Sequence, residues 1–363
     1  NIQGEYNDPK SGFTKISNLR TEIAGLDNIQ NYCKTNTMNP EKFSTVSFTQ
    51  KVRKSSGSSF LEPIDYHDFG FRVNYKKEIR LKPTSRMVSN TLGNWSETKK
   101  IFRLIKRFTF THNDYPLKID CSIVRSSNRR GRNLIPEYRV ESSGVFSNPE
   151  TYEIEIEMLK RGFPTSLGQT VEDALEPMNV LTIFKRTIKS VLSGLQNSNF
   201  PVSITEQNKV LDNYMNLIYQ GKKSDRRISS KNFVGFSSIS LEMPNITPID
   251  FDSDLPNIRT PYTVTEKADG MRKLLYIDKG GKIYFIDVNM NVQFTGMLSD
   301  NLDYHESLLD GEHVLHDKHG RFINYYMTFD AYYIGRRDIR SLPLAVVPEG
   351  QKMKTRAINI HRL

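Results

Sequence analysis

Strict alternation of apolar and charged residues is the sequence feature that most constrains the fold of this chain. Over residues 151–158, apolar side chains alternate with Glu153, Glu155 and Glu157, and segment 69–82 has the same two-residue period. Successive side chains of a strand point to opposite faces, so this period predicts strands with one apolar and one charged face. Shorter alternating segments lie at 19–23, 102–110, 117–125 and 138–141. The first part of the chain is therefore predicted to be rich in β-structure.

The three glutamates of segment 151–158 need neutralisation. Same-face neighbours on a strand are about 7 Å apart, so three like charges in a row repel one another. One interpretation is a solvated sheet face with lysines or arginines opposite. The other is a carboxylate row that binds Mg²⁺ or Mn²⁺, because hard cations prefer oxygen ligands. Basic faces elsewhere favour a barrel with a charged lumen, in which arginine and lysine bind phosphate.

The middle of the chain is predicted to be helical. Apolar residues recur at helical spacing over 171–196 and 206–219, and we expect both helices to pack on the barrel. Residues 221–227 form a basic turn, and 228–261, rich in Ser, Asn, Pro and Asp, are typical of a connection. Strands are predicted beyond it, at 262–266, 273–278, 282–288, 308–315 and 325–333.

Lys267 is a candidate nucleophile between two of these predicted strands. It begins the pattern Lys-x-Asp-Gly-x-Arg, which ends at Arg272. Strands fix the backbone on either side, while the turn leaves the side chain open to a ligand. With an ordinary pKa of about 10.4, lysine is almost fully protonated at neutral pH. Arg272 and a bound divalent metal would disfavour the ammonium form. The alternative interpretation is a surface lysine in a β-turn.

The pattern at Lys267 resembles motif I of the covalent nucleotidyltransferases, which include mRNA guanylyltransferases and ATP- or NAD-dependent ligases. Residues 308–314 resemble motif III, and 326–333 resemble motif IIIa. The resemblance implies that Lys267 attacks the α-phosphorus of GTP and holds GMP as a phosphoramidate. It also implies nucleotide contacts from Arg272, Glu312, Phe329 and Asp330, with Phe329 stacking on the base. Phe329 as a core aromatic and Glu312 as a turn cap are the alternatives.

The glutamate row and the basic strands together resemble the triphosphate tunnel metalloenzymes, a class of RNA triphosphatases. The resemblance implies an eight-stranded tunnel that removes the γ-phosphate of 5′-triphosphate RNA, with Mg²⁺ or Mn²⁺ at Glu153, Glu155 and Glu157. The early Glu-x-Glu strand of that family is not found before residue 69. Candidates for the charged lining are Arg20, Arg72, Lys76, Arg103 and Arg107 for triphosphate and RNA, with Glu22 and Asp120 beside them.

The order of the two patterns resembles the multifunctional mRNA capping enzymes of nucleocytoplasmic large DNA viruses, mimivirus-like and African swine fever virus-like. The predicted fold class is α+β. We predict an antiparallel β-barrel with flanking helices over 1–230, a connection over 231–261, and the N-terminal part of a nucleotidyltransferase domain over 262–363. The family's later motifs are not found after residue 333, so we expect a longer protein that ends in a methyltransferase.

Composition agrees with a nucleic-acid partner. The formal net charge is +10, which favours a polyanion, and no apolar run is long enough for a membrane span. The two cysteines lack metal-ligand spacing and suggest a reducing compartment. The resemblance implies GTP, RNA and viral transcription machinery as partners, in the virion and host cytoplasm. An AMP-transferring polynucleotide ligase and a non-catalytic RNA-binding module remain alternatives, and the charged β-domain favours capping.

Overall fold

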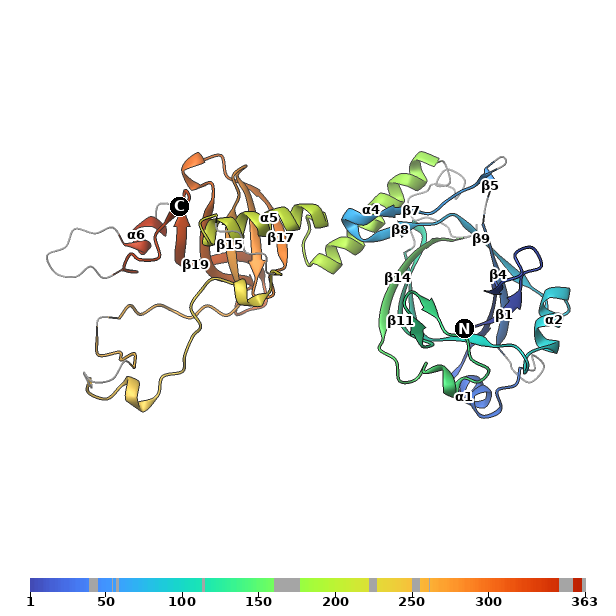
Figure 1. The fold of residues 1–363 in the computed structure, drawn as a ribbon. Helices are drawn as coiled ribbons and strands as arrows, with labels where there is room; N and C mark the ends of the chain where they lie inside the picture. The colour runs from blue at the N-terminus through green and yellow to red at the C-terminus, as the bar shows by residue number, and fades with distance from the viewer. Residues whose placement is uncertain are drawn as a thin grey trace. The chain divides into compact units, whose positions relative to one another are not determined.

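The chain forms two compact units. The computed structural model describes residues 1–38, 45–53, 55–56, 59–112, 115–159, 177–221, 227–249, 255–260, 262–345 and 355–360. Asn1–Asp65 and Arg72–Phe184 form the first unit, and Tyr66–Phe71 and Lys185–Leu363 form the second (Figure 1). The division after Phe184 lies earlier than the predicted boundary at 230. The predicted helix start at 171–176 and residues 222–226 of the basic turn lie outside the described residues.

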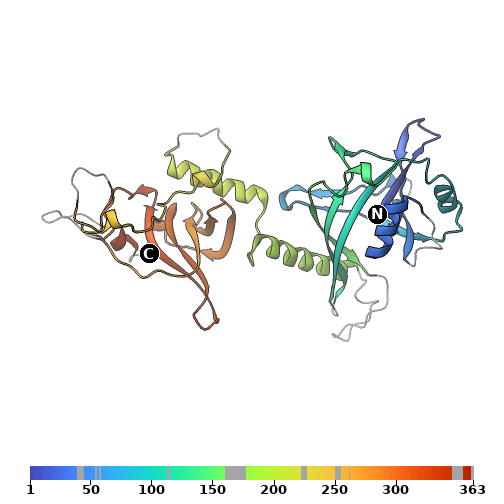
Figure 2. The ribbon, with the colours of Figure 1, turned by 90° about the horizontal axis from the view of Figure 1, so that it is seen from below.

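A curled antiparallel sheet makes up most of the first unit (Figure 1, Figure 2). Its strand order is β14-β11-β10-β1-β3-β4-β9, with β2 paired to β1. The bounds are β1 Ile2–Asn7, β2 Thr14–Ile16, β3 Leu19–Ile23, β4 Val46–Arg53, β9 Lys76–Leu81, β10 Lys100–His112, β11 Tyr115–Ser126 and β14 Thr151–Met158. The strands predicted at 19–23, 102–110, 117–125 and 151–158 are confirmed.

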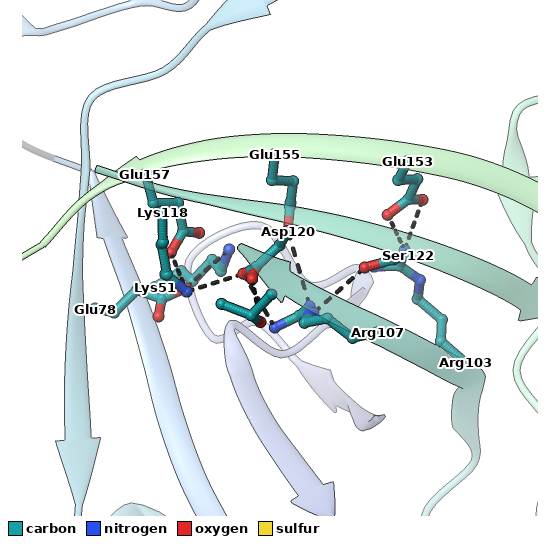
Figure 3. Close-up of polar contacts among 11 residues, drawn as sticks. Lys51, Glu78, Arg103, Arg107, Lys118, Asp120, Ser122, Glu153, Glu155 and Glu157 are labelled. Carbon is teal, nitrogen blue, oxygen red and sulfur yellow. Dashed lines mark hydrogen bonds and ion pairs between the residues drawn. The ribbon is translucent and has the colours of Figure 1, made fainter. Parts of the chain in front are cut away.

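Charge interactions across the sheet show how strongly it curls. Lys118 on β11 and Glu78 on β9 are five strands apart in the sheet order, which is about 24 Å in a flat sheet. Burial opposes ionisation of Glu78, but Lys51, Arg20 and Lys118 outweigh it and hold its pKa below the usual range. Figure 3 shows Lys118, Lys51 and Glu78 side by side. Among the described residues β9 and β14 remain the sheet edges, so a closed tunnel stays a prediction.

Two predicted strands of the first unit are wrong. Segment 69–82 is divided between β8 (Phe71–Val73), which pairs with β7 (Ile64–Tyr66), and β9 of the large sheet. The chain turns at Gly70, whose positive φ of 67° ends a short 3-10 helix (η2, His67–Phe69) before β8. The segment 138–141 is a turn that leads into another 3-10 helix, η3 (Glu141–Ser143). The two-residue period of apolar side chains therefore continues across segment 69–82, although these residues belong to two different strands.

Small elements complete the first unit. Helix α1 (Leu26–Thr35) packs through Tyr32 with Trp95 and Phe102 in one core cluster. Helix α2 (Arg86–Gly93) packs through Val88 with Leu19 in another. The remaining strands form two-stranded sheets, β5 (Ser55–Ser56) with β6 (Ser59–Phe60) and β12 (Arg129–Arg130) with β13 (Asn133–Leu134).

The second unit contains an antiparallel sheet with the order β17-β16-β15-β18-β19-β20. Its strands are β15 Met271–Ile277, β16 Lys282–Asp287, β17 Val292–Leu298, β18 Ser307–His316, β19 Phe322–Ile334 and β20 Arg337–Asp338. The strands predicted at 273–278, 282–288, 308–315 and 325–333 are confirmed, and β17 was missed. No strand forms at 262–266. Tyr262 and Val264 are 53% and 92% exposed there, so their alternation has no apolar face to bury.

Helix α5 (Ile204–Ile218) packs on the second unit. Its Val210, Tyr214 and Leu217 share a buried cluster with Leu274 of β15 and Tyr284 of β16. The expectation that this helix packs on the barrel is therefore wrong. Helix α4 (Pro177–Gln196) precedes it, and α6 (Arg356–Ile360) packs against β19. None of the described helices is long and apolar enough to cross a membrane.

A buried polar chain links β15 to β18 within this unit. Lys273 is 4% exposed, and its Nζ lies 2.7 Å from Gln293 Oε1, to which it donates, and 3.0 Å from His313 Nδ1. His313 Nε2 lies 2.8 Å from Asn324 Oδ1. These partners fit a neutral imidazole that accepts at Nδ1 and donates at Nε2. Burial lowers the pKa of His313, and the Lys273 charge lowers it further, although Asn324 opposes them.

Acidification should therefore destabilise the second unit through His313. A histidine with a lowered folded pKa binds fewer protons folded than unfolded, so its stabilisation is complete above the ordinary pKa of about 6.5 and is lost as the pH falls below it. The urea concentration at the unfolding midpoint should be lower at about pH 5.5 than at about pH 7.5. In His313→Gln, this decrease in the midpoint should be smaller. Equal falls in both proteins would contradict this role.

Candidate functional site

The predicted charged face of the first unit is assembled by strand register. On β14, Glu153, Glu155 and Glu157 oppose Ser122, Asp120 and Lys118 of β11. On the other side of β11, Ser122 opposes Arg107 and Asp120 opposes Thr109 of β10. Because side chains alternate along each strand, all of these lie on one face of the sheet, together with Arg103 (Figure 3). This face, called the inner face below, is also the one on which Glu78 and Lys51 lie.

Each glutamate of the inner face has its own cation. Arg103 Nη2 donates to both carboxylate oxygens of Glu153, at 2.6 and 2.7 Å. Lys118 Nζ lies 2.9 Å from Glu157. Glu155 has only Arg107, whose Nη2 is 3.8 Å from the carboxylate. The repulsion expected among three glutamates is thus relieved by side chains of the neighbouring strands.

Asp120 is the buried centre of the inner face. Its side chain is 1% exposed and accepts hydrogen bonds from Thr109 Oγ1 at 2.6 Å and Lys118 Nζ at 2.9 Å. Burial raises its pKa, but Thr109, Lys118 and Arg107 outweigh burial and hold the pKa below its usual range. Asp120 is therefore an anion at neutral pH that fixes Lys118 in place.

Arg107 is held more loosely than Arg103 and Lys118, each of which has a carboxylate within hydrogen-bond distance. Its nearest carboxylate oxygens are at 3.7 Å on Asp120 and 3.8 Å on Glu155, both longer than a hydrogen bond. Its Nε donates to Ser122 Oγ across 3.3 Å, a long hydrogen bond. With a side chain 32% exposed, Arg107 retains N–H groups that can bind a phosphate oxygen.

The other predicted lining residues of the first unit divide into two groups. Arg20 lies near the inner face, because its charge lowers the pKa of Glu78. Lys76 lies two residues before Glu78 on β9, where it is the register partner of Arg53. Arg72 is not brought to this face, because its guanidinium pairs with Asp65 within the β7–β8 hairpin. Within the described residues no group of three or more His, Cys, Asp or Glu side chains could hold a metal ion. The predicted Mg²⁺ or Mn²⁺ therefore stays a prediction.

Lys267 lies in the second unit, in the irregular segment that precedes β15. Its side chain is 85% exposed, and Nζ donates to Asp269 Oδ1 at 2.9 Å. That hydrogen bond raises the pKa of Lys267, and the charge of Glu312 raises it further. The sequence predicts that Arg272 disfavours the ammonium form. The groups that act on Lys267 in this structure, Asp269 first, instead favour that form.

Arg272 is engaged by Asp310 rather than by Lys267. Its Nε and Nη2 donate to the two carboxylate oxygens at 3.1 and 2.6 Å, and Nη1 donates to the Phe236 carbonyl at 2.8 Å. Asp310 is fully buried and also accepts from Tyr332 Oη at 2.6 Å. Sequence reasoning passed over Asp310 as a site residue. The available signal was its position two residues before Glu312, which places both side chains on one face of β18.

The segment that precedes Lys267 passes close to this ion pair at Gly235. Gly235 has a positive φ of 148°, and a Cβ built there would lie 2.5 Å from Arg272 Nη2 and 3.0 Å from Asp310 Oδ2. Tyr214 of α5 anchors the same segment, because its hydroxyl donates to Asn232 O at 2.7 Å and accepts from Val234 N at 2.9 Å. Only glycine fits at 235.

Gly235→Ala should consequently destabilise the second unit by about 2–3 kcal/mol, through backbone strain and displacement of Arg272 from Asp310. Gly320→Ala is the matched control, since Gly320 also has a positive φ, 77°, with nothing within 4 Å of its Cβ position. The control should cost only about 1 kcal/mol in urea unfolding. Equal costs would show that the contact with Arg272 contributes nothing.

The remaining predicted nucleotide contacts surround Arg272 unevenly. Glu312 is its direct register partner on β18. Phe329 is 40% exposed, with its ring centroid 5.9 Å from Arg272 Cζ, so it is not a core aromatic. Asp330 points elsewhere: it is 8% exposed and pairs with Arg356 at 2.9 Å. Burial raises the pKa of Asp330, and Arg356 opposes that shift. The structure thus groups Arg272, Glu312 and Phe329 but directs Asp330 toward Arg356.

Comparison with known proteins adds two findings. Residues 195–356 match the family described as mRNA capping enzyme, catalytic domain. The chain is also 26% identical over 301 residues to a protein of Acanthamoeba polyphaga mimivirus named "Probable mRNA-capping enzyme". That similarity covers 82% of this chain and 21% of the relative, so the chain spans about a fifth of the relative's length. The family match includes α5 and the sheet on which it packs. The second unit is therefore similar to the catalytic domain of mRNA capping enzymes.

Proposed function

We propose that the second unit transfers GMP from GTP to an RNA end through a covalent adduct on Lys267. The observation that carries this proposal is the grouping of Glu312, Arg272 and Phe329, with the exposed Lys267 close enough to feel the charge of Glu312, in a region similar to the capping-enzyme catalytic domain. A fixed guanidinium beside a half-exposed aromatic ring suits a nucleotide, which offers a phosphate, a ribose and a base. Phe329 is the residue proposed to stack on that base.

The chemistry assigns a separate task to each group. Lys267 Nζ, once deprotonated, attacks the α-phosphorus of GTP, the bond to the β-phosphate oxygen breaks, and pyrophosphate leaves. A terminal oxygen of the diphosphate RNA end then attacks the same phosphorus, and the Lys267 amine leaves. Asp269 favours the ammonium form before the first step, so entry of the phosphates must draw Nζ away from it. Asp310 keeps Arg272 in place throughout, because its carboxylate is fully buried.

The nucleotide preference tests the proposed reaction. The full-length protein is incubated with a divalent cation and with α-labelled GTP or α-labelled ATP, then denatured before electrophoresis. Label retained from GTP supports guanylyl transfer. Label retained from ATP alone would assign the second unit to the ligases, and label from neither nucleotide would favour a non-catalytic binding module.

We propose that the inner face of the first unit binds the 5′-triphosphate of RNA and removes its γ-phosphate. In that reaction water attacks the γ-phosphorus, the bond to the bridging oxygen breaks, and inorganic phosphate leaves a diphosphate end. The support is the arrangement around the buried Asp120, which offers phosphate oxygens one cation fixed in place, Lys118, and one with available N–H groups, Arg107. Mg²⁺ or Mn²⁺ belongs to this proposal. The glutamates are each tied to a separate cation, so these pairs must rearrange for a metal to bind.

A further inference from the structure

A run of exposed cations lies on and beyond β9, an edge strand of the curled sheet among the described residues. The strip consists of Lys76, Lys77, Arg80, Lys82 and Arg86, all of which are exposed. Within the residues that the structure describes, none of these five has an ion-pair partner. The one acidic residue in the run, Glu78, is neutralised by Lys51 of β4 at 2.9 Å. The strip therefore presents a net positive surface.

Register connects this strip to the inner face. Glu78 opposes Lys51 of β4, and Lys76 and Arg80 lie on the same face of β9 as Glu78. Since Lys118 and Arg20 both act on Glu78, that face belongs to the curled interior. Lys76 and Arg80, about 13 Å apart along the strand, therefore carry positive charge from the inner face to the edge. Lys82 and Arg86 continue it toward α2.

We propose that this strip binds the ribose–phosphate backbone of single-stranded RNA whose 5′ end lies on the inner face. The inference rests on the proposed triphosphate-binding function. An RNA held by its 5′ end must leave the curled sheet past an edge, and β9 is an edge whose charge complements the phosphates. Sequence-independent binding of single strands combines such a cationic track with aromatic side chains on which bases stack. Tyr75, 58% exposed, directly precedes the strip.

The basic hairpin β12–β13 is the strongest competitor on this unit. It carries Arg129, Arg130 and Arg132, which are exposed as well. These arginines stand on a separate two-stranded sheet, however, and no register connects them with the inner face. The hairpin therefore supplies a control of equal charge and similar exposure.

The test compares two triple variants by fluorescence anisotropy with 5′-hydroxyl RNA of about 20 nucleotides, which lacks the triphosphate. The strip variant is Lys77→Gln/Lys82→Gln/Arg86→Gln, and the control is Arg129→Gln/Arg130→Gln/Arg132→Gln. The strip variant should bind the RNA about 10-fold more weakly. The slope of log K against log salt concentration should become less steep by about 2, which is close to 0.7 for each of the three lost phosphate contacts. The control should retain both values. Matching thermal melting curves establish that both variants are folded.

The result is separable from the function on which it rests. Phosphate release from a triphosphate dinucleotide, too short to reach the strip, should be unchanged in the strip variant. If the unmodified protein releases no phosphate from the dinucleotide, the triphosphatase proposal is refuted. The difference in RNA binding between the two triple variants can still be measured in that case. If RNA binding weakens equally in both triple variants, or does not weaken in the strip variant, the proposal that the strip binds RNA is overturned. Displacement of the RNA by polyglutamate at equal charge concentration would assign the strip to an acidic protein and overturn it too.

Discussion

Lys267→Ala and Lys267→Arg should each abolish the covalent GMP adduct of the full-length protein, by at least about 1,000-fold, because the attacking atom is lost. The arginine variant is the sharper of the two. It keeps the positive charge that pairs with Asp269, but a guanidinium stays protonated at any working pH and supplies no free amine. The measurement is protein-bound label after incubation with α-labelled GTP and denaturation.

Lys279→Arg is the matched control for this experiment. Lys279 is exposed in the turn between β15 and β16, in the same unit but outside the grouping around Arg272. The control variant should label like the unmodified protein. Label that survives in Lys267→Ala would place the nucleophile elsewhere and remove the central residue from the proposed site.

Periodicity predicted the strands that carry charge on one face, and the reason is physical. Along β14, a shift of one residue would turn the three glutamates away from the cations of β10 and β11 that neutralise them, so only one facing is possible. The same argument failed for segment 69–82. A two-residue period says that a face exists, but here it continues through Asn74 and Tyr75, where the chain leaves β8 before it enters β9. It failed again at 262–266, where alternation occurs without a neighbouring strand.

Helix packing illustrates a similar limit. The apolar face of α5 was visible in the sequence, and Val210 and Tyr214 are indeed buried. What an amphipathic pattern does not contain is the identity of the surface that covers it. That surface is formed by β15 and β16, which follow more than fifty residues later in the sequence.

The candidate sites were predictable only as far as their motifs extend. The motifs identified Lys267, Arg272 and Glu312, but the contacts that hold Arg272 come from Asp310, Tyr332 and the Phe236 carbonyl. Those contacts depend on strand register and on the path of the segment around Gly235, which no local pattern encodes. In the first unit, likewise, the glutamate row was evident, whereas the buried position of Asp120 follows from pairing on both sides of β11.

Arg107→Gln should reduce γ-phosphate release from 5′-triphosphate RNA by about 100-fold, which corresponds to about 2.7 kcal/mol, the scale of a charged hydrogen bond to phosphate. Arg107 has no carboxylate within hydrogen-bond distance among the described residues, so binding phosphate costs it no strong existing pair. Arg103, in contrast, is committed to Glu153 through two short bonds. Glutamine keeps a polar side chain and removes the charge.

Arg125→Gln is the control that separates position from charge. Arg125 lies on β11, next to β10, but alternation places it on the opposite face from Lys118 and Asp120, where it pairs with Glu150 at 2.9 Å. It carries the same guanidinium at similar exposure, so a general loss of positive charge would affect both variants alike. If Arg125→Gln slows phosphate release as much as Arg107→Gln does, the inner face is not the triphosphate site. If neither variant slows it, Arg107 does not contact the phosphate that is transferred, and its assignment as a triphosphate-binding residue is overturned.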